Sequence, residues 1–268
     1  MLEATGISHR VNGVVTLADT SIEVKAGEFV AIVGPNGAGK TTLMAMLAGE
    51  LEPSTGTVTL AGKPLKDTTL EERSRLRAYL PPMQTQEIGF TVREVVAMGR
   101  HPWRDQDLPD DDLTEAALEA AGVASLAGRK LGSLSTGEAQ LVQIARIFSQ
   151  QAALLLLDEP TGGLDISHQE RILRALASRA DHHSVVAVLH DINAAASVAD
   201  RMLIMSGGKA VAFGSPAQVL NEDLLSDVYD HPISVISHPF RDGPLVLVGN
   251  QTSDVRPAPR PSPQTPPR

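Results

Sequence analysis

The sequence predicts an α/β protein, and three observations support this fold class. Short apolar runs recur at Phe29–Val33 and at residues 154–157, 185–189 and 202–205, and segments with helical spacing separate them. A glycine-rich turn follows the first run and leads directly into a helix-like segment. The stretch from about residue 81 to 150 is mainly helical. We therefore expect parallel strands joined by crossover helices, with a helical subdomain inserted between two halves of the core.

The N-terminal residues predict antiparallel strands. Residues 2–24 contain alternating apolar runs on either side of a polar turn at Asn12 and Gly13. The core strand Phe29–Val33 comes next, and a later Pro-Ser-Thr-Gly turn leads into a strand at residues 57–60. The expected architecture is thus an α/β core with an N-terminal antiparallel β subdomain.

The turn after Phe29–Val33 reads GPNGAGKTT and matches the phosphate-loop pattern G-x-x-x-x-G-K-[ST] in full. Small residues let backbone N–H groups close around phosphates, and the start of the following helix adds the positive end of its dipole. Lys40 can reach between the β- and γ-phosphates of a nucleoside triphosphate, and the Thr41 hydroxyl can ligate the bridging Mg²⁺. A plain glycine turn is disfavoured because strand and helix signals flank it. The predicted nucleotide-binding residues are Gly34, Pro35, Asn36, Gly37, Ala38, Gly39, Lys40, Thr41 and Thr42.

A further helix is predicted just before the insertion. Residues 69–77 are charged and contain neither glycine nor proline. We expect this helix to continue up to Pro81 and Pro82, because proline lacks the N–H group that a helix interior needs.

The insertion contains repeated helix signals. Thr91 and Glu94 have the spacing of a capping box, and residues 112–122 predict a second helix that a glycine ends. Ser135 and Glu138, in the segment LSTGE, repeat the capping pattern ahead of a helix whose apolar residues share one face.

The C-terminal part divides into an ordered and a disordered segment. Residues 245–248 predict a last short strand. Residues 251–268 are rich in proline and almost free of apolar side chains, which predicts a disordered tail. Residues 1–250 are then expected to form one domain that includes the helical subdomain.

Two carboxylates, Asp158 and Glu159, directly follow the apolar run at residues 154–157. Adjacent acids at the end of a core strand lie beside the phosphate loop in P-loop folds, where one holds Mg²⁺ and the other orients the attacking water. We assign Asp158 to the metal and Glu159 to the water. His190 follows another apolar run, within expected reach of a γ-phosphate. The alternatives are an acidic strand end that only caps a turn and a structural histidine.

Composition limits the classes of protein. The chain has 268 residues with 42% hydrophobic content, enough for one large α/β domain, and contains no cysteine, which excludes disulfides and thiolate metal sites. A net charge of −9 disfavours a nucleic-acid partner. No apolar run approaches the roughly twenty residues of a membrane span, and no secretion signal is evident at the N-terminus. Any membrane role is therefore expected to depend on a partner.

GPNGAGKTT, LSTGE, LLLLDEP, GGLD and VLHD occur in the order and spacing of the ATP-binding subunits of ABC transporters, which the sequence resembles over roughly residues 1–250. The resemblance implies an ATPase that uses ATP and Mg²⁺ as a head-to-tail homodimer. Each ATP would touch the phosphate loop of one copy and the LSTGE segment of the other. Ser135 and Gly137 would then meet the γ-phosphate in trans, and Asp165 would couple the two sites.

The sequence departs from the family pattern at three places. Thr136 stands where glycine is usual, and Pro82 stands where the family has a glutamine that ligates Mg²⁺. Gln84 or Gln86 could take that role if the loop is shifted. No aromatic residue lies near His9 to stack on adenine, so any stacking must be weak, cationic or made elsewhere.

Two segments resemble a subgroup of importers. FTVREVVAMGRHPW resembles the ATPases of importers for chelated iron, haem and cobalamin, at the place where the family meets its transmembrane permease. VYDHPISVISHP followed by GPLVLV is most similar to haemin import subunits. The resemblance implies haem uptake, a peripheral position on the cytoplasmic face of the cell membrane, and an extracytoplasmic haem-binding protein as an indirect partner. A siderophore or cobalamin importer is the alternative.

Two further classes are disfavoured. A soluble ABC ATPase acting on DNA or ribosomes predicts a long coiled coil, a second cassette or a basic surface, and the sequence contains none of these. A P-loop kinase would leave the LSTGE segment unexplained.

Overall fold

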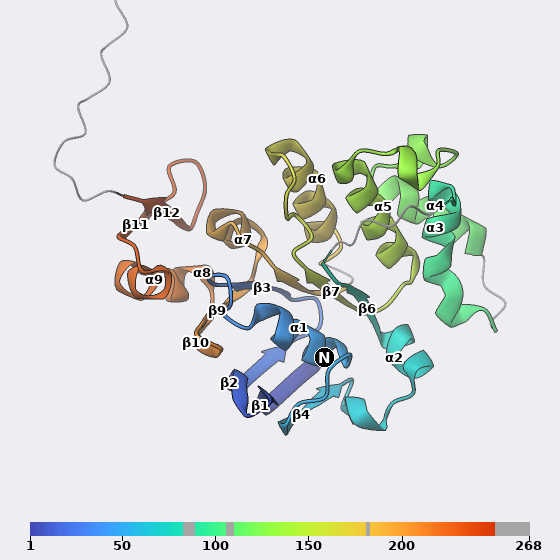
Figure 1. The fold of residues 1–268 in the computed structure, drawn as a ribbon. Helices are drawn as coiled ribbons and strands as arrows, with labels where there is room; N and C mark the ends of the chain where they lie inside the picture. Colours follow the sequence, from blue (N-terminus) through green and yellow to red (C-terminus); the bar gives the residue numbers. More distant parts are fainter. Residues whose placement is uncertain (83–88, 106–109, 181–182, 250–268) are drawn as a thin grey trace, which may run out of the picture.

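The computed structural model describes residues 1–82, 89–105, 110–180 and 183–249. A six-stranded sheet with the order β10-β9-β3-β8-β7-β6 runs through its centre (Figure 1). The pairs β9–β3, β3–β8, β8–β7 and β7–β6 are parallel, and β10 is antiparallel to β9. The strands are β3 (Phe29–Val33), β6 (Arg77–Leu80), β7 (Leu154–Asp158), β8 (Ser184–Val188), β9 (Arg201–Ser206) and β10 (Lys209–Gly214).

A second, antiparallel sheet with the order β2-β1-β4-β5 is formed by the N-terminal part of the chain. Helix α1 (Lys40–Ala48) lies between this sheet and the central sheet (Figure 1). Leu43, Met44 and Leu47 are fully buried because α1 is covered on both sides. The strands are β1 (Leu2–Val11), β2 (Val14–Val24), β4 (Thr55–Leu60) and β5 (Lys63–Pro64).

The two faces of the central sheet belong to two different cores. Along β3, Phe29, Ala31 and Val33 join a cluster with the helices above the sheet, and the alternate residues join the cluster around α1. The upper layer contains α5 (Thr136–Ser149), α6 (Ile166–Ala177) and α7 (Ile192–Val198). Every residue of β3, β7 and β8 is buried, as expected for strands covered on both faces.

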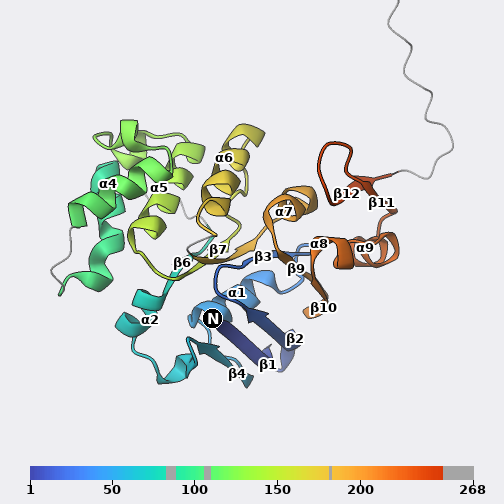
Figure 2. The ribbon, with the colours of Figure 1, turned by 180° about the vertical axis from the view of Figure 1, so that it is seen from behind.

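The helical region and the C-terminal elements lie at opposite ends of the molecule (Figures 1 and 2). The helical region packs α3 and α4 against α5. Besides α5, the elements of this region are α3 (Val92–Ala97), η2 (Met98–Trp103), α4 (Asp110–Ala120), η3 (Ala124–Leu126) and η4 (Leu131–Ser133). The short elements before it are η1 (Leu65–Asp67) and α2 (Leu70–Leu76).

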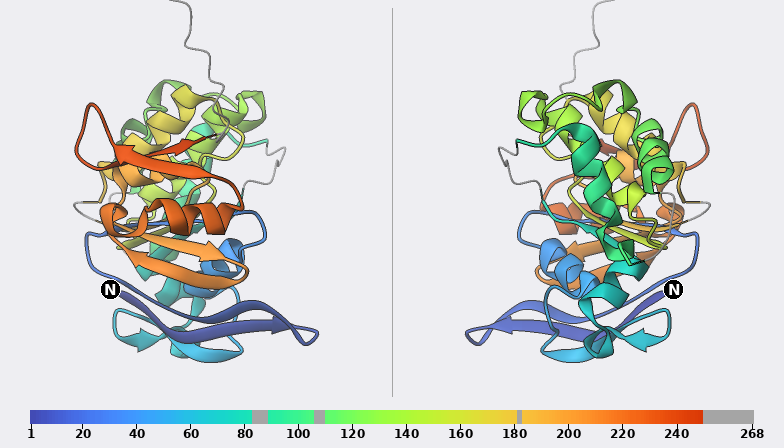
Figure 3. Two further views of the ribbon diagram at one scale, coloured as in Figure 1. Left: turned by 90° about the vertical axis from the view of Figure 1, so that its left-hand side faces the viewer. Right: turned by 90° about the vertical axis from the view of Figure 1, so that its right-hand side faces the viewer.

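The C-terminal elements attach to α7. β11 (Ile233–Ser237) and β12 (Pro244–Val248) form an antiparallel pair beside α8 (Pro216–Val219) and α9 (Glu222–Tyr229), as Figure 3 shows. The Asn193 side chain on α7 donates to the Val246 carbonyl at 2.9 Å and accepts from the Val246 N–H at 2.8 Å. One amide therefore continues the hydrogen-bonding pattern of β12 onto the helix.

Most predicted elements are confirmed, including the capping boxes at Thr91 and Ser135. The expected helix up to Pro81 is wrong. α2 ends at Leu76, and the next four residues form β6 at the edge of the central sheet. Ala78 and Leu80 are buried beneath the helical region, so burial against β7, which local spacing does not reveal, determines their conformation.

Some predictions remain open. The subdomain limits at residues 81 and 150 and the domain boundary at 250 stay predictions, and the proposed tail, residues 251–268, lies outside the described residues. Among the described residues, no helix is long and apolar enough to cross a membrane.

Candidate functional site

The phosphate loop connects β3 to α1, and two of its glycines, Gly34 and Gly39, lie against the backbone of neighbouring segments. Gly34 has φ +153°, and a Cβ atom there would lie 2.2 Å from the Met205 carbonyl oxygen on β9. A Cβ at Gly39, with φ +92°, would lie 3.1 Å from the Thr16 carbonyl oxygen. The sequence analysis predicted glycines here so that phosphate could approach the backbone. The structure gives a second reason, because the backbone of neighbouring segments occupies the space that a side chain would need.

Lys40 is the first residue of α1 and folds back across the loop. Its Nζ donates to the carbonyl oxygens of Gly34 at 2.8 Å and Pro35 at 2.9 Å. The residue is only 5% exposed, and this burial lowers the pKa of the ammonium, against the opposing effects of Glu159 and Asp158. The structure thus holds one cation inside the loop with two carboxylates nearby.

A cavity of about 460 Å³ opens over the loop. Glu159 contributes to its wall from the end of β7, so the predicted phosphate loop and one predicted catalytic residue share one space. The other lining residues are Val15, Thr16, Asn36, Gly37, Ala38, Gly39, Lys40, Thr41, Thr42, Gly207 and Gly208.

Asp158 ends β7 and is completely buried. Neither of its carboxylate oxygens has a partner in hydrogen-bonding geometry among the described residues. Burial raises the pKa of this carboxyl, against the opposing effects of Thr41, Lys40 and His190. Oxygen atoms are the ligands that Mg²⁺ prefers. Two unpartnered carboxylate oxygens close to the Thr41 hydroxyl therefore fit a magnesium ion.

Glu159 and His190 form a pair. His190 Nε2 lies 2.9 Å from Glu159 Oε1, and the two residues follow the adjacent strands β7 and β8. Glu159 adopts φ +55°, a left-handed conformation that is uncommon for any residue except glycine. Residues in sparsely populated backbone conformations cost on the order of 1 kcal/mol or more and cluster at functional sites.

Ser135, Gly137 and Asp165 do not line the cavity. Ser135 caps the N-terminus of α5, where its hydroxyl accepts from the Glu138 N–H at 3.3 Å and its own N–H donates to the Glu138 carboxylate at 2.8 Å. Asp165 caps α6 with its side chain alone, which accepts from the His168 N–H at 3.0 Å. Within one chain, the structure therefore gathers the phosphate loop, Asp158, Glu159 and His190, and leaves the other predicted residues elsewhere.

Several features of the cavity were not predicted from the sequence. Gly207 and Gly208 form the turn between β9 and β10 with φ +53° and +76°, and the Ala18 N–H donates to the Gly208 carbonyl at 2.7 Å. The adjacent glycines were a visible turn signal, but nothing local said that the turn faces the loop. Val15, 43% exposed, provides an apolar surface where the sequence has no aromatic residue.

Three residues, Pro82, Gln84 and Gln86, bear on the Mg²⁺-ligating glutamine that the family pattern has and this sequence lacks. Pro82 is exposed, two residues after the end of β6. Gln84 and Gln86 lie outside the described residues, so their suggested role as a magnesium ligand stays a prediction.

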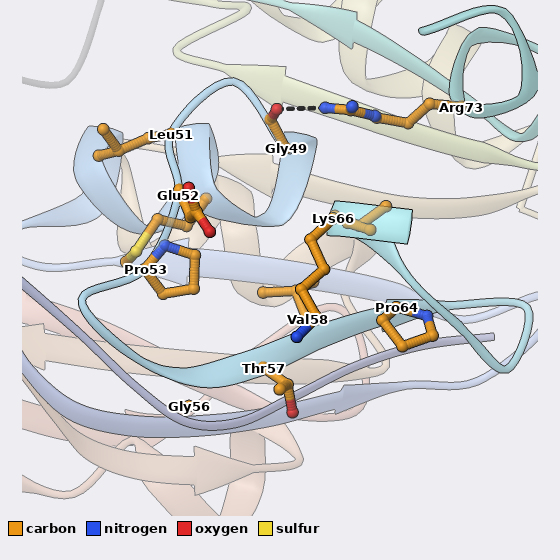
Figure 4. A pocket seen from close by; sticks show the side chains of 12 residues that line it. Gly49, Leu51, Glu52, Pro53, Gly56, Thr57, Val58, Pro64, Lys66 and Arg73 are labelled. Atoms are coloured by element: carbon orange, nitrogen blue, oxygen red, sulfur yellow. Dashed lines mark hydrogen bonds between the residues drawn. The ribbon is translucent and has the colours of Figure 1, made fainter. Parts of the chain in front are cut away.

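A second cavity, of about 350 Å³, lies at the C-terminal end of α1, and no predicted site residue lines it (Figure 4). It is bounded by β4, η1 and the loop after Gly49. Arg73 donates to the Gly49 carbonyl oxygen, as the dashed line in Figure 4 shows. Gly49 ends α1 in a left-handed conformation, so the guanidinium satisfies a carbonyl at the negative end of the helix dipole. Arg73 therefore has a structural role here.

The arrangement of a phosphate loop on β3 with paired acids on β7 defines a nucleotide-hydrolysing α/β fold, and comparison with known proteins identifies its class. The sequence model of the ABC transporter family matches residues 17–162. The chain belongs to the ABC transporter family and is an ATPase of that family, which confirms the resemblance found in the motifs.

The curated relatives include haemin import proteins. "Hemin import ATP-binding protein HmuV" of Nocardia farcinica is 50% identical over 234 residues, which cover 86% of this chain and 81% of the relative. The protein of the same name from Rhodococcus jostii is 43% identical, and the match covers 92% of this chain and 85% of the relative.

Solved structures confirm the fold. The dimeric ATP-binding cassette MJ0796 bound to ADP and Pi superposes with a TM-score of 0.71 at 25% identity, covering 80% of this chain and 98% of the cassette. A metal-chelate type ABC transporter in an inward-facing conformation gives a TM-score of 0.79 at 23% identity, covering 93% and 97%. ABC cassettes thus bind nucleotide, dimerise and pair with membrane subunits.

Proposed function

We propose that this chain is the ATP-hydrolysing subunit of an importer that takes up haemin. The proposal is supported by the name shared by relatives at 43% and 50% identity. It is also supported by the ABC motifs GPNGAGKTT, LSTGE, LLLLDEP, GGLD and VLHD. In this proposal the chain lies on the cytoplasmic face of the cell membrane, bound to transmembrane permease subunits. An extracytoplasmic haem-binding protein delivers the cargo to the permease. Uptake of a ferric siderophore or cobalamin is the alternative, because the cargo contacts the permease and not this subunit.

The observation that carries the ATPase proposal is that Lys40 and Glu159 line one cavity. Asp158 lies directly before Glu159 in the chain, and His190 pairs with Glu159. Lys40 offers a desolvated ammonium to the β- and γ-phosphates of ATP. Asp158 and Thr41 would hold Mg²⁺, which neutralises charge on the phosphates when it is bound. The two orphaned oxygens of Asp158 support this assignment.

Glu159 is proposed to orient the attacking water and to accept its proton. The carboxylate lines the cavity, and His190, at 2.9 Å, fixes the direction of one of its oxygens. The left-handed backbone of Glu159 is consistent with a residue that is placed for chemistry and not for fold stability.

A head-to-tail homodimer is proposed to complete the site. Ser135 and Thr136 are exposed at the N-terminus of the 14-residue helix α5 but do not line the cavity of their own chain. A second copy would bring this helix N-terminus to the γ-phosphate, where backbone N–H groups and the helix dipole favour negative charge. Closure on ATP and reopening after hydrolysis would then move the permease.

Two variants test the ATPase assignments. Glu159→Gln should still bind ATP and accumulate as an ATP-bound dimer with negligible turnover, measured by size-exclusion chromatography and phosphate release. Normal turnover in this variant would refute the role of Glu159. Lys40→Ala should lose ATP binding, whereas the control Lys63→Ala removes an exposed lysine paired with Glu72 and should bind normally.

Reconstitution tests the cargo. The chain is copurified with its permease and placed in vesicles with a binding protein loaded with haemin, a ferric siderophore or cobalamin. Haemin should stimulate ATP hydrolysis several-fold more than the other two. Stimulation by either alternative cargo and not by haemin would overturn the haemin proposal while leaving the ATPase assignment intact.

A further inference from the structure

His168, in the first turn of α6, occupies the space that a side chain at Gly137 would need. A Cβ atom built on Gly137 would lie 2.5 Å from His168 Cδ2 and 2.6 Å from Cγ. The His168 side chain is 23% exposed, so most of the ring is covered. The glycine of the LSTGE segment is thus required by an imidazole of the same chain, independently of any nucleotide.

The same ring holds Asp165. His168 Nδ1 lies 2.9 Å from Asp165 Oδ2, and the His168 N–H donates to Asp165 Oδ1 at 3.0 Å. Ser167 Oγ donates to Oδ1 as well, at 2.7 Å. Both oxygens of this 66%-exposed carboxylate are therefore engaged by the first turn of α6. The Nδ1 contact comes from the same side chain whose ring lies against Gly137 of the LSTGE segment.

We propose that His168 is a positioning residue that joins Asp165 to the LSTGE segment, so that the surfaces a second copy meets move as one unit. α5 packs against α3 and α4 in the helical region, whereas α6 follows β7 of the central sheet (Figure 1). The His168 ring therefore bridges two parts of the fold. Without the ring, Asp165 Oδ2 loses its hydrogen-bond partner, and the N-terminus of α5 loses a packing contact. This inference rests on the proposed homodimer, and it adds a residue that the motifs did not single out.

The location of His168 predicts which measurements change. It does not line the phosphate cavity, so binding of ADP to the phosphate loop should not depend on it. Assembly of the ATP-bound dimer and turnover should depend on it, because both use Asp165 and the LSTGE segment of the partner.

Two substitutions separate the hydrogen bond from the bulk of the ring. His168→Asn places an amide donor where Nδ1 lies, and His168→Leu keeps volume over Gly137 without a donor. His168→Leu should lower kcat roughly five- to tenfold, the size expected when a hydrogen bond to a charged group is lost at a partly exposed position. It should weaken ATP-driven dimerisation of the Glu159→Gln chain by a similar factor. His168→Asn should recover most of both effects, and ADP affinity should match the wild type in each variant.

The outcomes are distinguishable from failure of the proposed function. If Glu159→Gln alone does not dimerise on ATP, the homodimer proposal fails. If it does, and His168→Leu dimerises and turns over as well as the parent, the positioning role of His168 is refuted. Equal loss of ADP affinity and thermal stability in His168→Leu would also refute it, because the residue would then support the whole fold.

A second cycle tests the contact itself and needs no nucleotide. Gly137→Ala should lower the Tm by several degrees, because the added methyl group meets the His168 ring. In a His168→Ala background the same substitution should cost much less. Gly132→Ala, where a Cβ would meet nothing within 4 Å, is the matched control. An equal Tm loss from Gly137→Ala in both backgrounds would show that the ring does not occupy this space.

Discussion

The Gln150 side chain should make a measurable contribution to the junction between the helical region and the central sheet. Its Nε2 donates to the Ser74 carbonyl at 2.6 Å and to the Arg77 carbonyl at 2.9 Å, where α2 gives way to β6. The Gln150 carbonyl accepts from Trp103 Nε1 at 2.7 Å. The end of α5 is thereby tied both to the sheet edge and to η2.

Gln150→Ala removes the two side-chain hydrogen bonds and keeps the bond from Trp103, which uses the main chain. Each lost bond contributes about 1 kcal/mol net, so the expected loss is about 2 kcal/mol in the free energy of unfolding. For a chain of this size, 1 kcal/mol corresponds to roughly 2 °C, which predicts a fall in Tm of about 4 °C.

Differential scanning calorimetry of the isolated chain measures this change. Gln143→Ala, on the same helix, is the control, because the Gln143 side chain makes no hydrogen bond to the described part of the chain. A Tm for Gln150→Ala within one degree of the control would refute the reasoning, because it would show that the two carbonyl groups find other partners at no cost.

Three further predictions concern the site. Asp158→Asn should raise the Tm of the nucleotide-free chain while abolishing Mg²⁺-dependent ATP hydrolysis. Burial raises the pKa of the Asp158 carboxyl, so the free energy of unfolding falls as the pH rises from the ordinary aspartate pKa through the raised one. The Asn variant should therefore lose less stability than the wild type between pH 4 and pH 8 in thermal melts. His190→Ala should slow phosphate release about 100-fold with unchanged ADP affinity, and unchanged turnover would contradict its role. Gly34→Ala should lose nucleotide binding, because its Cβ would overlap the Met205 carbonyl, whereas Gly128→Ala, in open space, should bind normally in the same titration.

The parts of the site that could be predicted from the sequence are those whose chemistry is local. The phosphate loop is read from consecutive residues, because glycine spacing, Lys40 and Thr41 have to lie within one turn of each other. The acids at the end of β7 follow from an apolar run that ends in charge. Each capping box is likewise complete within four residues, and the structure confirms them.

What the sequence could not provide depends on contacts between distant segments. β6 was missed because its first residue is Arg77, which reads as helical and exposed. Its guanidinium is in fact buried, and Nη2 pairs with Glu50 Oε1 at 2.6 Å. His168 and Gly137 lie 31 residues apart (168 − 137), and no spacing rule connects a helix start with a glycine in another helix. The turn at Gly208 lies beside the phosphate loop because β9 is the neighbour of β3 in the central sheet, and the sequence does not reveal that strand order.

Three residues of the site carry costs that oppose folding, and the proposed binding of ATP and Mg²⁺ would remove those costs. Lys40 is desolvated, Asp158 is buried with two unpartnered oxygens, and Glu159 adopts a left-handed backbone. Each of these features opposes folding, by about 1 kcal/mol or more for the backbone alone. The hydrogen-bond acceptors of the Lys40 ammonium in the described part of the chain are two neutral carbonyl groups, and the Asp158 carboxylate oxygens have no partner there in hydrogen-bonding geometry. The groups that would satisfy both are a polyphosphate and a divalent cation. ATP with Mg²⁺ should therefore stabilise the chain by more than its contacts with the loop alone, because binding also removes costs that the native fold already carries.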